Sequence, residues 1–138
     1  MPAKDIYHEV VKQALVKDGW KILGEGYTLE YEGDNLYADI AAEKPIAAER
    51  ENQRILVEVK SFLGRSFMND LEMAIGQYII YRDIVETKGL NFKLYLAVTI
   101  AVYDAGFQKQ LARLIIERNK VNLLIFDPNQ EVLLEWIS

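Results

Sequence analysis

Hydrophobic and polar residues follow two different periods along this chain of 138 residues. In residues 5–18, apolar side chains recur every three to four positions and Gly19 follows them, which predicts an amphipathic helix with a defined end. In other segments, short apolar or alternating runs lie between glycine-containing turns, which is typical of β-strands. In the first part of the chain, these predicted strands are 20–23, 27–31 and 36–41.

The second part of the chain alternates between the same two periods. A polar segment, 43–53, contains Pro45 and is predicted to be a loop before a strand at 54–60. Asn69 is a candidate cap for a long helix that ends near Thr87. The remaining predicted elements are a strand at 92–101, a helix at 107–119, a strand at 121–126, a turn at 127–130 and a strand at 131–137.

This order of elements predicts an α/β fold in which helices flank a mixed central β-sheet. The length is that of one ordinary domain, so we expect residues 1–138 to form a single domain. Hydrophobic residues make up 51% of the chain, but no apolar segment reaches the roughly 18 residues that span a bilayer. The N-terminus has no signal-peptide pattern and cysteine is absent, so we expect a soluble, cytoplasmic protein.

The apolar strand at 54–60 carries an acid and a base two positions apart. Because side chains alternate along a strand, Leu56, Glu58 and Lys60 share one face. Burying an unpaired charge is costly, so both charges need partners or a hydrated cleft that contains a cation. The alternative is an exposed strand with one polar face.

The acidic residues are concentrated around this strand. Residues 28–58 contain eight acids and three bases, a local charge of −5, which equals the net charge of the whole chain. A divalent cation would offset part of this charge. Since contacts of Lys and Arg with phosphates supply most of the affinity for DNA, we expect the isolated protein to bind DNA weakly. His8 is the single histidine, which excludes a histidine-rich metal cluster, and we expect it on the solvent side of the first helix.

Asp39 and Glu58 lie on predicted strands that are joined by one loop. If the strands pair, directly opposed residues have Cβ atoms about 4.5–5.5 Å apart, and two carboxylates at that distance repel each other. One or two Mg²⁺ or Mn²⁺ ions would remove this conflict, and a bound metal could activate water. Lys60 could then orient the nucleophile or stabilise the developing anion.

Gln77 and Tyr81 are spaced i, i+4 on the helix that follows the Glu58 strand, so they share one helical face. Their amide and phenol could reach the site or a substrate phosphate. The alternative is that Tyr81 is ordinary core and Gln77 a boundary residue.

The combination of a strand aspartate, a Glu-x-Lys strand and a Gln-x-x-x-Tyr helix resembles the PD-(D/E)xK nuclease superfamily. The matching residues are Asp39, Glu58, Lys60, Gln77 and Tyr81. The core of that superfamily contains a helix, three strands, a helix and a strand. The resemblance implies a restriction-endonuclease-like fold and a Mg²⁺-dependent DNA phosphodiesterase. Ala38 stands where the family motif has proline. The implied roles are metal ligation by Asp39, Glu58, the Val59 carbonyl and auxiliary Glu9, catalysis by Asp39, Glu58 and Lys60, and auxiliary contacts by Gln77 and Tyr81.

A second similarity is carried by residues 3–5, 37–39, 57–62 and 76–78. On these residues, nearly the whole chain is similar to the XisH family, the fdxN element excision controlling factors. This similarity implies a role in programmed DNA excision beside a site-specific recombinase and a companion protein of the XisI type. Three hypotheses follow: an active DNA endonuclease, a non-catalytic recombination controlling factor that works through a partner protein, and a purely structural module without a site.

Candidate DNA contacts are Arg65, which lies in the connection beside the site, and Lys109 with Arg113 on the last helix. Simple solvation of the surface also explains the second pair. The sequence leaves the oligomeric state open, a homo-oligomer included.

Overall fold

A computed structural model describes residues 4–45 and 52–138 and places six strands and four helices within them. The order of elements agrees with the prediction apart from two differences: α3 is an additional short helix, and two predicted strands form the single strand β1. In chain order the elements are α1 (His8–Lys17), β1 (Lys21–Tyr31), β2 (Asp34–Lys44), β3 (Gln53–Val59), α2 (Phe67–Thr87), β4 (Lys93–Thr99), α3 (Ile100–Ala105), α4 (Gln110–Arg118), β5 (Leu123–Asp127) and β6 (Val132–Ile137).

The six strands form one mixed sheet in which spatial order follows chain order, from β1 to β6. β1, β2 and β3 pair antiparallel, β3, β4 and β5 pair parallel, and β6 returns antiparallel to β5. The parallel pairs require crossovers, which α2 provides between β3 and β4, and α3 with α4 between β4 and β5. The predicted mixed sheet and the predicted pairing of the Asp39 and Glu58 strands are therefore confirmed.

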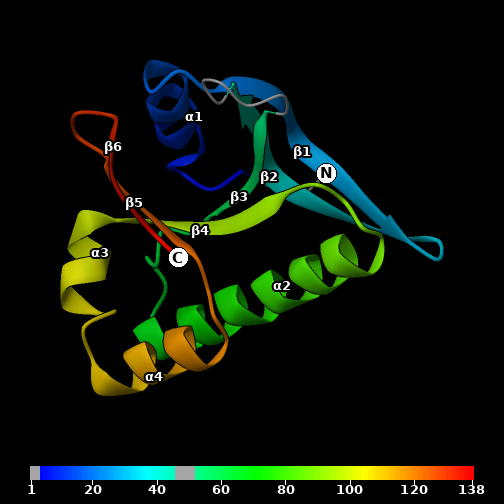
Figure 1. The fold of residues 1–138 in the computed structure, drawn as a ribbon. Helices are drawn as coiled ribbons and strands as arrows, with labels where there is room; N and C mark the ends of the chain where they lie inside the picture. Colours follow the sequence, from blue (N-terminus) through cyan, green and yellow to red (C-terminus); the bar gives the residue numbers. More distant parts are fainter. Residues whose placement is uncertain (1–3, 46–51) are drawn as a thin grey trace.

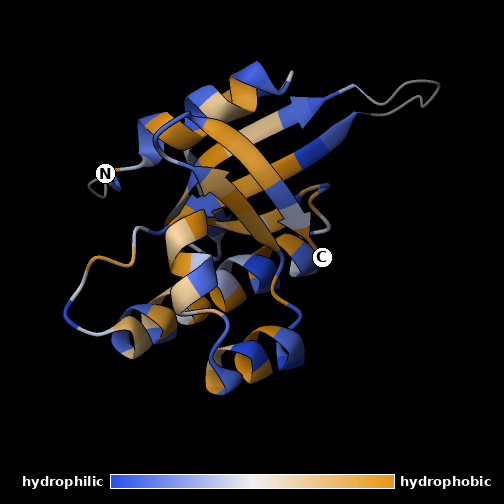
Figure 2. Cartoon of the chain, turned by 90° about the vertical axis from the view of Figure 1, so that its left-hand side faces the viewer, coloured by the Kyte–Doolittle hydropathy of each residue, from blue (hydrophilic) through white to orange (hydrophobic). Residues whose placement is uncertain are grey.

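The helices cover the sheet on both faces (Figure 1). α1 packs Val11 and Leu15 against one face, beside Ile55 and Val57 of β3. α2 covers the other face, where Leu56 of β3 is buried among its side chains. β3 is thus buried on both sides. Figure 2 shows that much of the strand layer is hydrophobic. Such a position explains why this strand consists mainly of Ile, Leu and Val.

Several predicted boundaries are wrong in local detail. The two predicted strands around Gly24 are one strand, β1, because a register shift between Ile22 and Gly24 absorbs the irregularity. The cap of α2 is Ser66, whose hydroxyl accepts a hydrogen bond of 3.2 Å from the Asn69 N–H. β4 ends at Thr99, whose side chain caps α3. The predicted loop at 43–53 includes residues 46–51, which lie outside the described residues.

Within the described ranges, no helix is both long and apolar enough to cross a membrane.

Candidate functional site

The two acids Asp39 and Glu58 face each other across β2 and β3. The two strands pair up to Ile40 opposite Val57, and the same register places Asp39 opposite Glu58. The Asp39 N–H donates a hydrogen bond of 3.2 Å to Oε1 of Glu58, and the Val59 N–H donates one of 2.7 Å to Oδ2 of Asp39. Each carboxylate is thus anchored to the backbone of the opposite strand.

Burial and mutual repulsion disturb the ionisation of this pair. Burial, followed by the negative charge of Asp39, raises the pKa of Glu58 to about 8, and Lys60 acts in the opposite direction. Burial also raises the pKa of Asp39, against the hydrogen bond from Val59. Without a cation, the pair therefore tends to retain one proton at neutral pH.

Lys60 places a positive charge beside the pair. Its Nζ lies 3.8 Å from Oε2 of Glu58, and a quarter of its side chain, 26%, is exposed, against 5% for Glu58. The Lys60 side chain is thus partly accessible to a ligand, whereas the Glu58 side chain is almost fully enclosed. This contrast suits a base that contacts substrate beside a buried metal-binding acid.

A cavity of about 170 Å³ opens beside the acids. Tyr81 donates a hydrogen bond of 3.3 Å from its hydroxyl to the Tyr37 carbonyl, so the helix α2 is connected to β2 at this cavity. The Oε1 atom of Gln77 is buried without a hydrogen-bond partner among the described residues. Burial, followed by the charges of Glu58 and Asp39, raises the pKa of Tyr81 to about 12, which keeps its hydroxyl protonated. The lining residues are Lys4, Asp5, Tyr37, Asp39, Glu58, Val59, Lys60, Gln77 and Tyr81.

Six residues proposed from the sequence therefore meet at one cavity, and four do not. Glu9 lies outside it, with a side chain that is 60% exposed and 3.7 Å from Lys4. Arg65 is exposed and also outside the lining, as are the candidate DNA contacts Lys109 and Arg113. The residues that meet are Asp39, Glu58, Val59, Lys60, Gln77 and Tyr81.

Asp5 is a lining residue that the sequence interpretation missed. Its Oδ1 accepts a hydrogen bond of 2.9 Å from the Tyr7 N–H, and its Oδ2 accepts one of 2.9 Å from the Ser61 N–H. Only the first contact has a sequence signal, because an Asp just before a helix often accepts an N–H two residues later. The second joins positions 56 residues apart and has no local signature.

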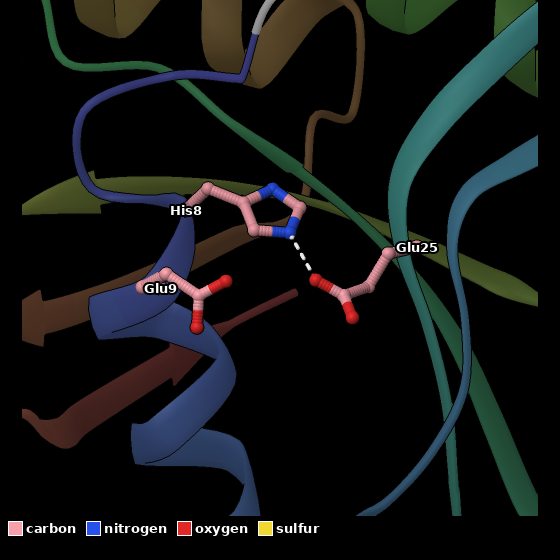
Figure 3. Close-up of side chains that lie close together, drawn as sticks. All are labelled: His8, Glu9 and Glu25. Atoms are coloured by element: carbon pink, nitrogen blue, oxygen red, sulfur yellow. Dashed lines mark hydrogen bonds and ion pairs between the residues drawn. The ribbon is translucent and has the colours of Figure 1, made fainter.

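The placement of His8 corrects a prediction. It was expected on the solvent side of the first helix, but it is only 2% exposed, and its Nε2 lies 2.8 Å from Oε1 of Glu25 on β1 (Figure 3). The helical stripe of apolar residues did not reveal this contact because Glu25 comes from a different element. A hydrogen bond from Lys12, followed by one from His8, lowers the pKa of Glu25 to about 2.

His8, Glu9 and Glu25 could also be considered as metal ligands, since one ligand atom of each lies within 4.8 Å of the others. Two lysines already neutralise this cluster: Lys12 lies 3.0 Å from Glu25, and Lys4 lies 3.6 Å from it. Added positive charge would be repelled here. The cluster therefore fits an ion-pair network that joins α1 to β1.

The Asp39–Glu58 pair suits a divalent cation better. Backbone N–H groups bind Oδ2 of Asp39 and Oε1 of Glu58. The second oxygen of each carboxylate takes no part in these two hydrogen bonds. A hard ion such as Mg²⁺ takes one or two carboxylates and keeps several waters, for which the adjoining cavity has room. The unpartnered Oε1 of Gln77 is a further oxygen that a cation-bound water could satisfy.

Comparison with known proteins gives a consistent result. The XisH protein family matches residues 1–134. An XisH family protein from Nostoc punctiforme PCC 73102 has 41% identity and a TM-score of 0.87, with 97% of this chain and 100% of that chain covered. An fdxN element excision controlling factor protein from Anabaena variabilis has 42% identity and a TM-score of 0.86, with coverages of 98% and 100%. No match was found among curated protein sequences.

Proposed function

Since this chain belongs to the XisH family, we propose that it takes part in excision of a DNA element and that it does so as a metal-dependent DNA phosphodiesterase of the PD-(D/E)xK type. The order helix, three strands, helix, strand in α1–β4 fits the core of that superfamily. The observation that carries the proposal is the opposition of Asp39 and Glu58 at a cavity that Lys60 also lines.

In this proposal, Asp39 and Glu58 bind Mg²⁺ or Mn²⁺ through their carboxylates. The Val59 carbonyl would be the third ligand, because the N–H and C=O of one strand residue point to the same side of the strand and the Val59 N–H points to Asp39. The bound ion would lower the pKa of a water and stabilise charge on a phosphoryl oxygen.

The other side chains position the substrate. Lys60, whose side chain is partly exposed, would orient the attacking water or stabilise the developing anion. Gln77 supplies an amide to the ion's waters or to a phosphate, and Tyr81, with its raised pKa, remains a hydrogen-bond donor. Binding of a cation would also hold both acids ionised, because positive charge lowers the pKa of a nearby carboxyl group.

A second function has its own supporting observation. The positive charge of Lys60 already offsets the negative charge of Glu58, and a backbone N–H group donates a hydrogen bond to one oxygen of each acid. The negative charge of the pair is therefore partly compensated without a metal ion. The protein would then be a non-catalytic controlling factor with a nuclease-like fold. It would act in the cytoplasm through a companion protein of the XisI type and a site-specific recombinase.

Nicking of supercoiled plasmid separates the two functions. The purified protein is incubated with Mg²⁺, Mn²⁺ or EDTA, beside Glu58→Gln and Lys60→Ala. The phosphodiesterase predicts metal-dependent nicking that both substitutions reduce by at least about a hundredfold, in line with loss of a central electrostatic group. Equal nicking by the parent and both variants would identify a contaminant, and absence of nicking in every form would favour the controlling factor.

A further inference from the structure

Contacts with other segments fix the backbone at Lys60 and at the two residues that follow it. The Lys60 N–H donates a hydrogen bond of 3.1 Å to the Ala97 carbonyl of β4, and the next N–H, that of Ser61, donates to Asp5. Phe62 then adopts a positive φ of 56°, which a non-glycine residue rarely does. The chain thus leaves β3 through a defined turn.

The aromatic ring of Phe62 holds the far side of this turn. Its centroid lies 5.4 Å from the ring of Phe67 on α2 and 5.4 Å from that of Phe107, and those two rings are 5.5 Å apart. Aromatic pairs at such distances pack favourably. This three-ring cluster therefore compensates the unusual backbone conformation at Phe62.

Asp5 fixes the first residue of the turn, Ser61. Its carboxylate is bound at both oxygens by backbone N–H groups, one from Tyr7 at the start of α1 and one from Ser61. Because Tyr7 packs on Phe126 with a centroid distance of 5.8 Å, the start of α1 is itself connected to the sheet. Asp5 therefore links a supported helix start to the residue directly after Lys60.

We propose that Asp5 is a positioning residue for Lys60. By fixing the Ser61 N–H, it sets the direction of the peptide plane between Lys60 and Ser61, and with it the point from which the Lys60 side chain enters the cavity. The inference rests on the proposed function in one respect, namely that Lys60 contacts the substrate. Asp5 lines the same cavity, but both of its oxygens are engaged by backbone donors, so this role requires no contact with DNA.

Asp5→Asn tests the role because asparagine keeps the shape but offers one carbonyl oxygen for two N–H donors. Asp70→Asn is the matched control: Asp70 also accepts a backbone N–H in the same connection, that of Gly64 at 2.8 Å, but it does not line the cavity. Melting temperatures of both variants establish that they are folded at the assay temperature.

Two readouts are measured. The first is single-turnover nicking, in which Asp5→Asn should lower the maximal rate by about ten- to a hundredfold with little change in the DNA concentration for half-maximal rate. Asp70→Asn should leave both values unchanged. An unchanged maximal rate in Asp5→Asn, with an active parent, would overturn the proposal.

The second readout does not depend on cleavage. NMR relaxation of the Lys60 side chain and hydrogen exchange of the Ser61 amide should show lower order and at least about tenfold faster exchange in Asp5→Asn, but not in Asp70→Asn. Unchanged order and exchange would overturn the positioning role, even if the parent proves inactive. An inactive parent in which Asp5→Asn still loosens Lys60 would contradict the phosphodiesterase alone.

Discussion

The Asp39 N–H donates its hydrogen bond to the carboxylate of Glu58, at the point where the pairing of β2 and β3 stops. Beyond Ile40 and Val57, side-chain carboxylates accept the hydrogen bonds of the Asp39 and Val59 N–H groups. The strands can separate there without leaving these two N–H groups unsatisfied. The acids therefore line the cavity and also satisfy backbone N–H groups beside it.

Metal binding should stabilise the folded protein. If Asp39 and Glu58 bind a cation in the native state alone, Mg²⁺ at about 100 times its Kd adds about 2.7 kcal/mol to the free energy of unfolding. Thermal denaturation in increasing Mg²⁺ or Mn²⁺ measures this as a rise in Tm. Glu58→Gln should abolish the rise and Glu9→Gln should retain it, so an equal rise in all three proteins would exclude the acid pair as the site.

The stability of the metal-free protein should depend on pH through Glu58. Its pKa is raised to about 8 in the folded state from an ordinary value of 4.5, so between these values the folded state binds more protons than the unfolded state. The proton on Glu58 therefore stabilises the folded state. This contribution to the free energy of unfolding is complete below about pH 4.5 and is lost as the pH rises to about 8.

The comparison with Glu58→Gln isolates this contribution, since glutamine carries no titrating proton. Tm is measured from pH 5 to 8.5 in EDTA for both proteins. The Tm of the parent should fall relative to that of the variant as the pH rises. A constant difference across this range would show that the folded-state pKa of Glu58 is not raised.

His8 should matter for stability, although not for metal binding. His8→Ala removes a ring that is 2% exposed and the partner of Glu25, so we expect a loss of about 2–5 kcal/mol in the free energy of unfolding. The neighbouring exposed residue provides the control, because Glu9→Gln should change stability little. Urea denaturation compares the two, and equal losses would contradict the burial of His8.

DNA binding by the isolated protein should be weak in EDTA. The local charge of −5 over residues 28–58 repels the phosphate backbone unless a metal or another protein compensates it. Fluorescence anisotropy with a labelled duplex at physiological salt measures the affinity with and without Mg²⁺. Nanomolar binding in EDTA would show that a basic surface elsewhere dominates.

Local patterns predicted much of the fold. The apolar run in β3 and the periodicity of α1 and α2 reflect burial against one sheet, which is why the mixed α/β order followed from sequence. The predicted boundaries of the strands are wrong where a tertiary contact overrides the local signal. In β1, for example, pairing with β2 continues through Gly24.

In the candidate site too, local spacing identified some residues, whereas residues that depend on tertiary contacts were missed. Glu58, Lys60, Gln77 and Tyr81 could be identified because strand and helix spacing sets which residues share a face. Asp5 could not, since its contact with Ser61 joins two distant segments and depends on how the start of α1 packs. The burial of His8 was missed for the same reason, because its partner Glu25 lies on β1.

The most direct test of the central claim is anomalous diffraction from a crystal soaked in Mn²⁺. Our account predicts a peak between the Asp39 and Glu58 carboxylates, at about 2.0–2.4 Å from one oxygen of each and within reach of the Val59 carbonyl. The peak should be absent from Glu58→Gln crystals. A peak at His8, Glu9 and Glu25, or none at either place at a saturating Mn²⁺ concentration, would contradict the account.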